Sequence, residues 1–118
     1  MPTLSSHILD TIAGVSAAGI RVQLFYVGDE QARELIFDEN ADAEGRIVQT
    51  FAIPQGGASG EFELVFYSQQ YFEDQGRMEG VSQNMPRVIT RFSPTEREAR
   101  YHIPLVLSPH SYTFWWSK

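Results

Sequence analysis

The segment that indicates the fold most clearly is Ile20-Arg21-Val22-Gln23-Leu24-Phe25-Tyr26-Val27. In its first half, aliphatic residues occupy every second position and polar residues lie between them. Successive side chains of a β-strand point to opposite faces of the sheet, so this pattern predicts a strand with one buried and one exposed face. The stretch Gly28-Asp29-Glu30 follows it and is typical of a turn.

Similar short segments, separated by turn-forming residues, lie on both sides of it. Only residues 68–76 have the character of a helical turn, with Tyr71 and Phe72 able to pack inwards. We therefore expect one domain, residues 1–118, that folds as an all-β, two-sheet antiparallel β-sandwich of seven to eight strands with one short helix. The expected strands are residues 6–10, 20–27, 33–39, 46–51, 61–67, 87–92, 99–107 and 111–117.

The composition fits a single soluble domain. Of 118 residues, 42% are hydrophobic, which is enough for a core and too many for a disordered chain. No apolar run approaches the roughly 20 residues that span a bilayer, and residues 1–7 lack the pattern of a secretory leader, so we expect no membrane contact. The absence of cysteine excludes disulfides and thiolate nucleophiles, and it is compatible with a cytoplasmic location.

The charged residues and the histidines bear on two kinds of ligand, nucleic acids and metal ions. The formal net charge is −6, and the nine basic residues are scattered, so we expect no nucleic acid binding. The three histidines, His7, His102 and His110, have no local metal-ligand spacing. We therefore expect no metal and no other cofactor.

Several segments, far apart in the chain, together carry a resemblance to one family. They are Leu4-Ser5-Ser6-His7-Ile8-Leu9-Asp10-Thr11, Gly45-Arg46 after an acidic loop, and Tyr101-His102-Ile103-Pro104-Leu105-Val106-Leu107-Ser108-Pro109. Tyr71-Phe72 and Pro86-Arg87-Val88-Ile89 lie between them in the matching order. Over essentially its whole length, the chain resembles the transthyretin-like proteins.

This resemblance implies an activity and an assembly. The family includes transthyretin, which carries thyroid hormone, and the 5-hydroxyisourate hydrolases of urate breakdown. Two histidines and an arginine mark the hydrolases, and these match His7, Arg46 and His102. The resemblance thus implies hydrolysis of the ring amide bond of 5-hydroxyisourate to 2-oxo-4-hydroxy-4-carboxy-5-ureidoimidazoline, by a homotetramer (a dimer of dimers) with its active clefts along the channel between dimers.

The chemistry of such a reaction suits these residue types. Water is a poor nucleophile toward an amide carbonyl, and histidine is the side chain most often suited to deprotonate it near neutral pH. A fixed arginine stays cationic, donates two hydrogen bonds to ring atoms and stabilises the developing anion. We expect His7 and His102 to activate water and move protons, in an order that the sequence leaves open, and Arg46 to act as the electrostatic clamp.

The C-terminal end departs from the hydrolase pattern, which closes with Tyr-Arg-Gly-Ser. In an ungapped alignment the corresponding, expected substrate-binding residues are Trp115, Trp116, Ser117 and Lys118; a one-residue deletion in the preceding turn would instead align Ser117 with the serine of the pattern. The tryptophans either stack on a flat heterocycle or fill the channel. Two further hypotheses therefore stay open: a transthyretin-like binding protein without hydrolase activity, and a structural tetramer without a ligand.

Overall fold

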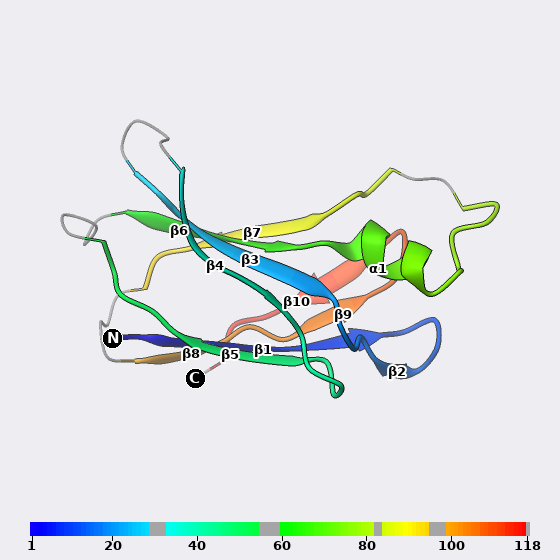
Figure 1. Ribbon diagram of the computed structural model, residues 1–118, viewed down its shortest axis with the longest axis horizontal. Coiled ribbons are helices and arrows are strands. Elements are labelled where there is room, and N and C mark those ends of the chain that lie inside the picture. Colours follow the sequence, from blue (N-terminus) through cyan, green and yellow to red (C-terminus); the bar gives the residue numbers. More distant parts are fainter. Residues whose placement is uncertain (29–32, 55–59, 82–83, 95–98, 118) are drawn as a thin grey trace.

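Two β-sheets pack face to face around the hydrophobic core in the computed structural model (Figure 1), which describes residues 1–28, 33–54, 60–81, 84–94 and 99–117. The first sheet has the order β10-β9-β1-β2, with β5 and β8 also paired to β1. The second has the order β4-β3-β6-β7. The elements are β1 (Thr3–Asp10), β2 (Val15–Ser16), β3 (Arg21–Val27), β4 (Arg33–Asn40), β5 (Arg46–Thr50), β6 (Glu61–Phe66), α1 (Ser68–Asp74), β7 (Val88–Phe92), β8 (Arg100–His102), β9 (Leu105–Leu107) and β10 (Tyr112–Phe114).

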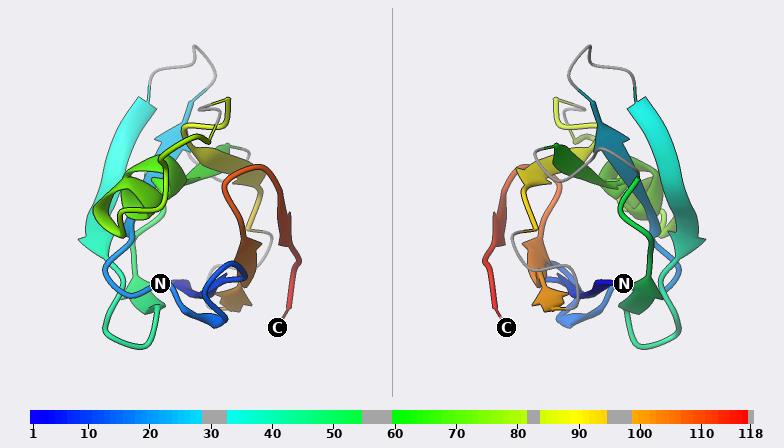
Figure 2. Two further views of the ribbon diagram at one scale, coloured as in Figure 1. Left: turned by 90° about the vertical axis from the view of Figure 1, so that its right-hand side faces the viewer. Right: turned by 90° about the vertical axis from the view of Figure 1, so that its left-hand side faces the viewer.

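The expected two-sheet sandwich with one short helix is confirmed. Viewed end-on (Figure 2), β4 and β10 lie at opposite sides of the sandwich, and α1 lies on the side of β4. Among the described strands both are edges, because β4 pairs with β3 alone and β10 with β9 alone. The described residues contain no helix long and apolar enough to cross a membrane.

Strand β1 is the centre of the first sheet and alternates regularly. Its even-numbered residues 4–10 are buried in the core, while the odd-numbered residues 3–9 are half-buried and point outward. One edge of β1 pairs antiparallel with β5 and then β2, and the other pairs parallel with β8 and then β9. The expected antiparallel pairing is therefore found throughout the second sheet, whereas the first sheet is mixed.

Residues 99–107, expected as one strand, form two. Ser5 lies opposite His102 and Ile8 opposite Leu105, so the register is the same on both sides of the break. The break contains Pro104, which has no N–H group to donate to a neighbouring strand. The short strand β2 lies between the expected strands 6–10 and 20–27, and β10 is shorter than the predicted strand 111–117.

The core lies between the sheets and is rich in aromatic rings. Phe62 is central, since its ring contacts those of Tyr26, Phe51 and Phe92 at centroid distances of 5.4, 5.2 and 5.9 Å. Such edge-on and offset contacts add to the stabilisation from buried apolar area. The fully buried side chains include Leu4, Ile8, Val22, Leu24, Leu64, Phe66, Phe72, Leu105 and Leu107.

A buried carboxylate connects the end of β1 to the helix. Asp10 is 1% exposed, and its Oδ1 accepts hydrogen bonds from the backbone N–H groups of Ile12 and Ala13 at 2.9 and 3.1 Å. Its Oδ2 accepts from the Tyr71 hydroxyl at 2.9 Å and from the Arg77 guanidinium. Burial acts to raise the pKa of this carboxyl, but the hydrogen bonds and the arginine charge outweigh it and lower the pKa below its usual value.

Candidate active site

His7, Arg46 and His102 lie on adjacent strands and share the outer face of the first sheet. His7 on β1 is directly opposite Arg46, the first residue of β5. On the other edge of β1, His102 at the end of β8 is opposite Ser5. Ser5 and His7 are two positions apart on β1 and therefore point to the same side. The sheet thus brings together three residues that are distant in sequence.

The backbone around Arg46 brings its side chain close to His7. The N–H of Arg46 donates to the Asp42 carboxylate and its carbonyl accepts from the Asp42 N–H, both at 2.9 Å. Both backbone groups therefore point away from β1, and His7 and Arg46 form a non-hydrogen-bonded pair, with Cα atoms about 4.5 Å apart. His102 lies diagonally from His7, because it is opposite Ser5 on the parallel strand β8.

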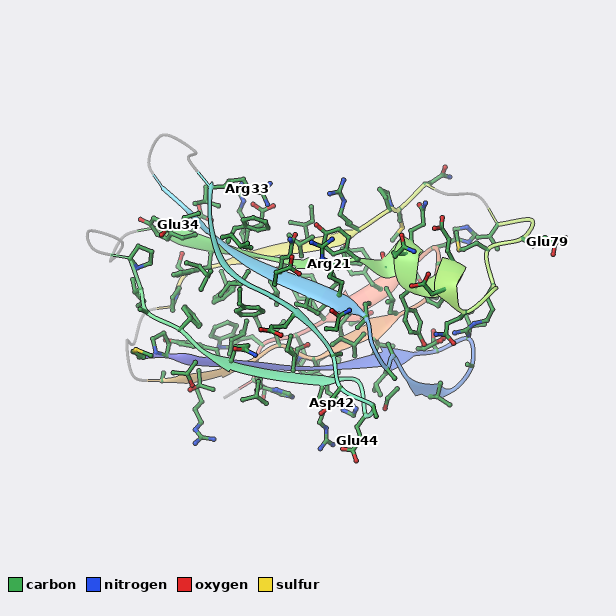
Figure 3. All side chains as sticks on the ribbon, viewed as in Figure 1. Arg21, Arg33, Glu34, Asp42, Glu44 and Glu79 are labelled. Carbon is green, nitrogen blue, oxygen red and sulfur yellow. The ribbon has the colours of Figure 1, made fainter. Side chains whose placement is uncertain are left out.

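The loop before β5 has the geometry needed to present Arg46. Gly45 has a φ of 71°, a conformation that favours glycine, and its carbonyl accepts from the Ile8 N–H at 2.8 Å. Asp42 Oδ1 accepts from the N–H groups of Arg46 and Glu44, and these bonds lower the pKa of the Asp42 carboxyl. Figure 3 shows Asp42 and Glu44 on the outer side of the first sheet.

The Arg46 guanidinium is accessible. Its side chain is 57% exposed, and its Nη1 lies 3.8 Å from Glu44 Oε2, which is a loose ion pair between exposed groups. Pairs of this kind contribute little stability, since solvent screens them and the side chains stay mobile. The guanidinium is therefore available to an anionic or carbonyl group that approaches the outer face.

Each imidazole makes one hydrogen bond to a serine. His102 Nδ1 lies 2.8 Å from Ser5 Oγ, and His7 Nε2 lies 3.3 Å from Ser16 Oγ. Within the described part of the chain, the other ring nitrogen of each histidine has no hydrogen-bond partner. The sequence reasoning missed both serines. Ser5 lies one residue before the predicted strand 6–10, and β1 includes it because this strand begins at Thr3, whereas Ser16 lay outside every expected strand.

The C-terminal segment runs alongside β8 and β9 in an unbroken register. Phe114 is opposite Leu105, and Ser117 is opposite His102. Ser117 is three residues after Phe114 and His102 is three residues before Leu105, so both pairs have the same antiparallel register. His102 and Ser117 exchange both backbone hydrogen bonds, at 3.0 and 2.9 Å. Ser117 therefore lies beside His102 on the outer face. Lys118 is outside the described residues.

The two tryptophans in this segment point to opposite sides. Trp116 faces the core edge, since its ring lies 5.0 Å from that of Tyr101 and 5.9 Å from that of Phe92. Trp116 is nevertheless 46% exposed, so its expected substrate-binding role stays a prediction. Trp115 faces outward by the alternation of the strand, although the two residues are equally exposed. Only one of the two indoles can therefore meet a ligand on the outer face.

Trp115 lies in the same row of the sheet as the charged pair. The continuous register aligns Trp115 with Pro104, and Pro104 with His7, which faces Arg46. A row across the sheet thus carries a guanidinium, an imidazole and an indole. The arginine at one end of this row can donate hydrogen bonds to a polar heterocycle, and the indole at the other end offers a flat surface for stacking.

The site is on the outer face of the first sheet. Two described cavities, of about 300 and 380 Å³, lie elsewhere: one between residues 18–21, Asn40 and residues 67–75, the other between Met1, residues 34–37 and residues 49–52. Neither cavity is lined by His7, Arg46 or His102. Among the described residues, no group of three or more His, Asp or Glu could hold a metal ion.

The family of this chain follows from its match to the HIUase/Transthyretin family over residues 4–116. The chain belongs to that family. It is 33% identical over 110 residues to "5-hydroxyisourate hydrolase 2" of Rhizobium meliloti (strain 1021), covering 93% of this chain and 91% of the relative. The match to a "5-hydroxyisourate hydrolase" of Deinococcus radiodurans is 33% identical over 116 residues and covers 95% and 92%.

Solved structures of family members share the fold. The structure of Klebsiella pneumoniae 5-hydroxyisourate hydrolase has a TM-score of 0.76 and 27% identity, with complete coverage of both chains. Sea bream transthyretin in complex with thyroxine has a TM-score of 0.79 at 23% identity, covering 97% of this chain and 93% of that one. The second likeness is one of fold alone. A 5-hydroxyisourate hydrolase and a transthyretin in complex with thyroxine thus share this sandwich, so the function must be argued from the site.

Proposed function

We propose that this protein is a 5-hydroxyisourate hydrolase, which opens the ring amide bond of its substrate to give 2-oxo-4-hydroxy-4-carboxy-5-ureidoimidazoline. The observation that carries the proposal is the placement of His7, Arg46 and His102 on one accessible face, across β5, β1 and β8. The relatives named as 5-hydroxyisourate hydrolases, which are 33% identical over more than nine-tenths of this chain, support it.

The two histidines carry the proton transfers. One imidazole removes a proton from water as the oxygen attacks the ring carbonyl, and an anionic tetrahedral intermediate forms. The C–N bond then breaks, and the departing nitrogen receives a proton from an imidazolium. His7 and His102 lie on either side of Ser5, one along β1 and the other across it, so both can reach a ring that lies over that residue.

Arg46 stabilises the charge that develops on the carbonyl oxygen. A guanidinium stays protonated throughout and donates two parallel hydrogen bonds. Because Arg46 is bound only loosely to Glu44, it reaches the substrate without giving up a strong ion pair. Removing such a donor typically costs about 10²- to 10³-fold in rate.

Residues of the C-terminal segment bind the substrate. Trp115 offers an exposed indole in the row of His7 and Arg46, and Ser117 offers a hydroxyl beside His102. Lys118, which lies outside the described residues, belongs to the same proposed set. In the family's hydrolases a tyrosine and an arginine stand at the two tryptophan positions, so we expect this protein to hold its ring by stacking rather than by a second guanidinium.

The open face needs a cover that excludes water. We propose that a homotetramer, a dimer of dimers, provides it by placing two such faces toward each other across a channel. The exposed apolar side chains of Val48 and Trp115 on this face support the proposal. Sedimentation velocity tests it, with a species of four times 13.4 kDa as the expected result and a monomer as the contrary one. We place the activity in urate degradation in the cytoplasm.

The activity is tested with freshly generated 5-hydroxyisourate, whose absorbance decay the purified protein should accelerate. His102→Ala should lose about 10²-fold or more of the rate, if this imidazole is a general base. His110→Ala is the matched control, because His110 is exposed in the turn before β10, away from the site. No acceleration by the unmodified protein, or no loss in His102→Ala, would refute the proposal.

The exposed indole of Trp115 also favours a second candidate, a binding protein without hydrolase activity. A flat apolar ligand that quenches the fluorescence of the unmodified protein, but not that of Trp115→Phe, would support this function. It replaces the first one only if 5-hydroxyisourate decays at the uncatalysed rate in the same sample.

A further inference from the structure

We propose that Ser5 is the positioning residue that makes His102 the first base. Its Oγ accepts the Nδ1–H hydrogen bond of His102, and this leaves Nε2 unprotonated toward the open face. The inference rests on the proposed function, because it assigns a role within that reaction. It also decides an order that the sequence left open between His102 and His7.

The backbone holds Ser5 and His102 in one fixed relation. They lie opposite each other on the parallel strands β1 and β8, and the carbonyl of Ser5 accepts from the Ile103 N–H at 2.9 Å. On its other side, His102 exchanges two backbone hydrogen bonds with Ser117. The backbone at His102 is thus hydrogen-bonded on both sides, to β1 and to the C-terminal segment. Only the side-chain torsions of the ring remain free, and the 2.8 Å contact with Ser5 restricts them.

The hydrogen-bond pattern distinguishes the two imidazoles. A neutral imidazole has one N–H and one lone pair, and the partner of one nitrogen decides the protonation of the other. His102 is bonded through Nδ1, so its Nε2 is the nitrogen that no described residue engages. His7 is bonded through Nε2 to Ser16, at the longer distance of 3.3 Å. The His102 ring is held by the shorter hydrogen bond, and no described residue engages its Nε2, so His102 suits the base. His7 suits the proton carrier.

The serine hydroxyl is an acceptor in this arrangement and not a nucleophile. As a base, Nε2 of His102 needs its lone pair for the attacking water, which places the ring proton on Nδ1. The Nδ1–H group of His102 donates to Ser5 Oγ in both the neutral and the protonated form of the ring. The ring therefore keeps its orientation while Nε2 gains a proton. A Ser5 that attacked the carbonyl would instead have to give its own proton to Nδ1 and form an acyl ester.

The test compares Ser5→Ala, Ser5→Thr and Thr3→Ala. We expect Ser5→Ala to lower kcat by roughly 10- to 100-fold with little change in KM, since a misoriented base slows the chemical step and not binding. Ser5→Thr keeps the hydroxyl and should retain most of the rate. Thr3→Ala is the matched control, because Thr3 lies on the same face of β1 but pairs its hydroxyl with Thr50 at 3.0 Å. A Ser5→Ala variant as fast as the unmodified protein overturns the proposal.

Nitrogen NMR of the histidine rings provides a readout that does not depend on turnover. In the unmodified protein at neutral-to-alkaline pH, His102 should show a protonated Nδ1 and an unprotonated Nε2. Ser5→Ala should show a mixture of tautomers, and Thr3→Ala should not. A proton on Nε2 in the unmodified protein overturns the proposal, as does an acyl adduct on Ser5 in mass spectra of quenched reactions. If the unmodified protein fails to hydrolyse 5-hydroxyisourate, the proposed function fails, while the NMR result still decides the Ser5–His102 hydrogen bond.

Discussion

Gly45 lies against the backbone of Ile8 so closely that a Cβ at position 45 would come within 2.6 Å of the Ile8 carbonyl oxygen. Replacing Gly45 by alanine therefore combines an unfavourable positive φ with a clash that the central strand cannot relieve. The conformational part alone is about 1–2 kcal/mol. We expect Gly45→Ala to lower the free energy of unfolding by more than this amount, measured by urea titration, and to lower the rate because Arg46 moves.

Gly14 provides the matched control for this prediction. It has a φ of 69°, but a Cβ there would meet no atom within 4 Å. Gly14→Ala should show the conformational cost and nothing more. Equal losses of stability in the two variants would contradict the steric argument.

Arg46 should matter for the reaction and not for stability. The side chain is largely exposed and its ion pair with Glu44 is loose, so Arg46→Lys should change the free energy of unfolding by less than about 0.5 kcal/mol. The rate should still fall by roughly 10²-fold, because an ammonium cannot donate two parallel hydrogen bonds. Steady-state kinetics and a urea titration of the same sample separate the two effects. A variant that loses stability and activity together would assign Arg46 a structural role.

The two neighbouring tryptophans should behave differently when replaced by alanine. Trp116 packs on Tyr101 and Phe92, and its loss should destabilise the protein by about 1–3 kcal/mol. Trp115 faces outward, so Trp115→Ala should leave the stability of the protomer nearly unchanged and raise KM. The reverse assignment, with KM sensitive to Trp116 alone, would mean that the segment has another register.

Asp10 should make stability depend on pH in the acid range. The pKa of its carboxyl is lowered in the folded protein, so the unfolded chain binds more protons as pH falls. The stabilisation is therefore complete above the unfolded value of about 3.9 and is lost as pH falls below it toward the folded value. We expect urea midpoints between about pH 5 and pH 2 to fall less steeply in Asp10→Asn than in the unmodified protein. Asp74→Asn on the exposed side of α1 should keep the original slope.

Local patterns in the sequence predict most strands but not their partners. Residues 20–27 and 61–67 were predicted because alternation and flanking turn residues are local signals, and β3 and β6 match them closely. One detail differs, because Gln23 was expected on an exposed face and is 8% exposed. Its amide donates to Asp38 and its carbonyl accepts from the Tyr67 hydroxyl, so neighbouring strands cover it. A local sequence pattern does not show which residues of neighbouring strands will bury a polar side chain.

The site was predicted in part for the same reason. His7, Arg46 and His102 were found through family resemblance, and the structure shows them on one face. The parallel pairing of β1 with β8, and with it the contact between Ser5 and His102, depends on residues about a chain length apart and has no local signal. The break at Pro104 did have one, since proline rarely continues a paired strand.

The pairing of β1 with β8 has a consequence during synthesis. Ser5 and His102 are 97 positions apart, so a ribosome must add nearly the whole chain before the second histidine can reach the first strand. Until then one edge of β1 has no neighbour, and the proposed catalytic face is incomplete on the nascent polypeptide. Contacts of such long range form slowly, and an unpaired edge invites association with other chains. A molecule truncated before β8 should therefore be both inactive and a target for chaperones.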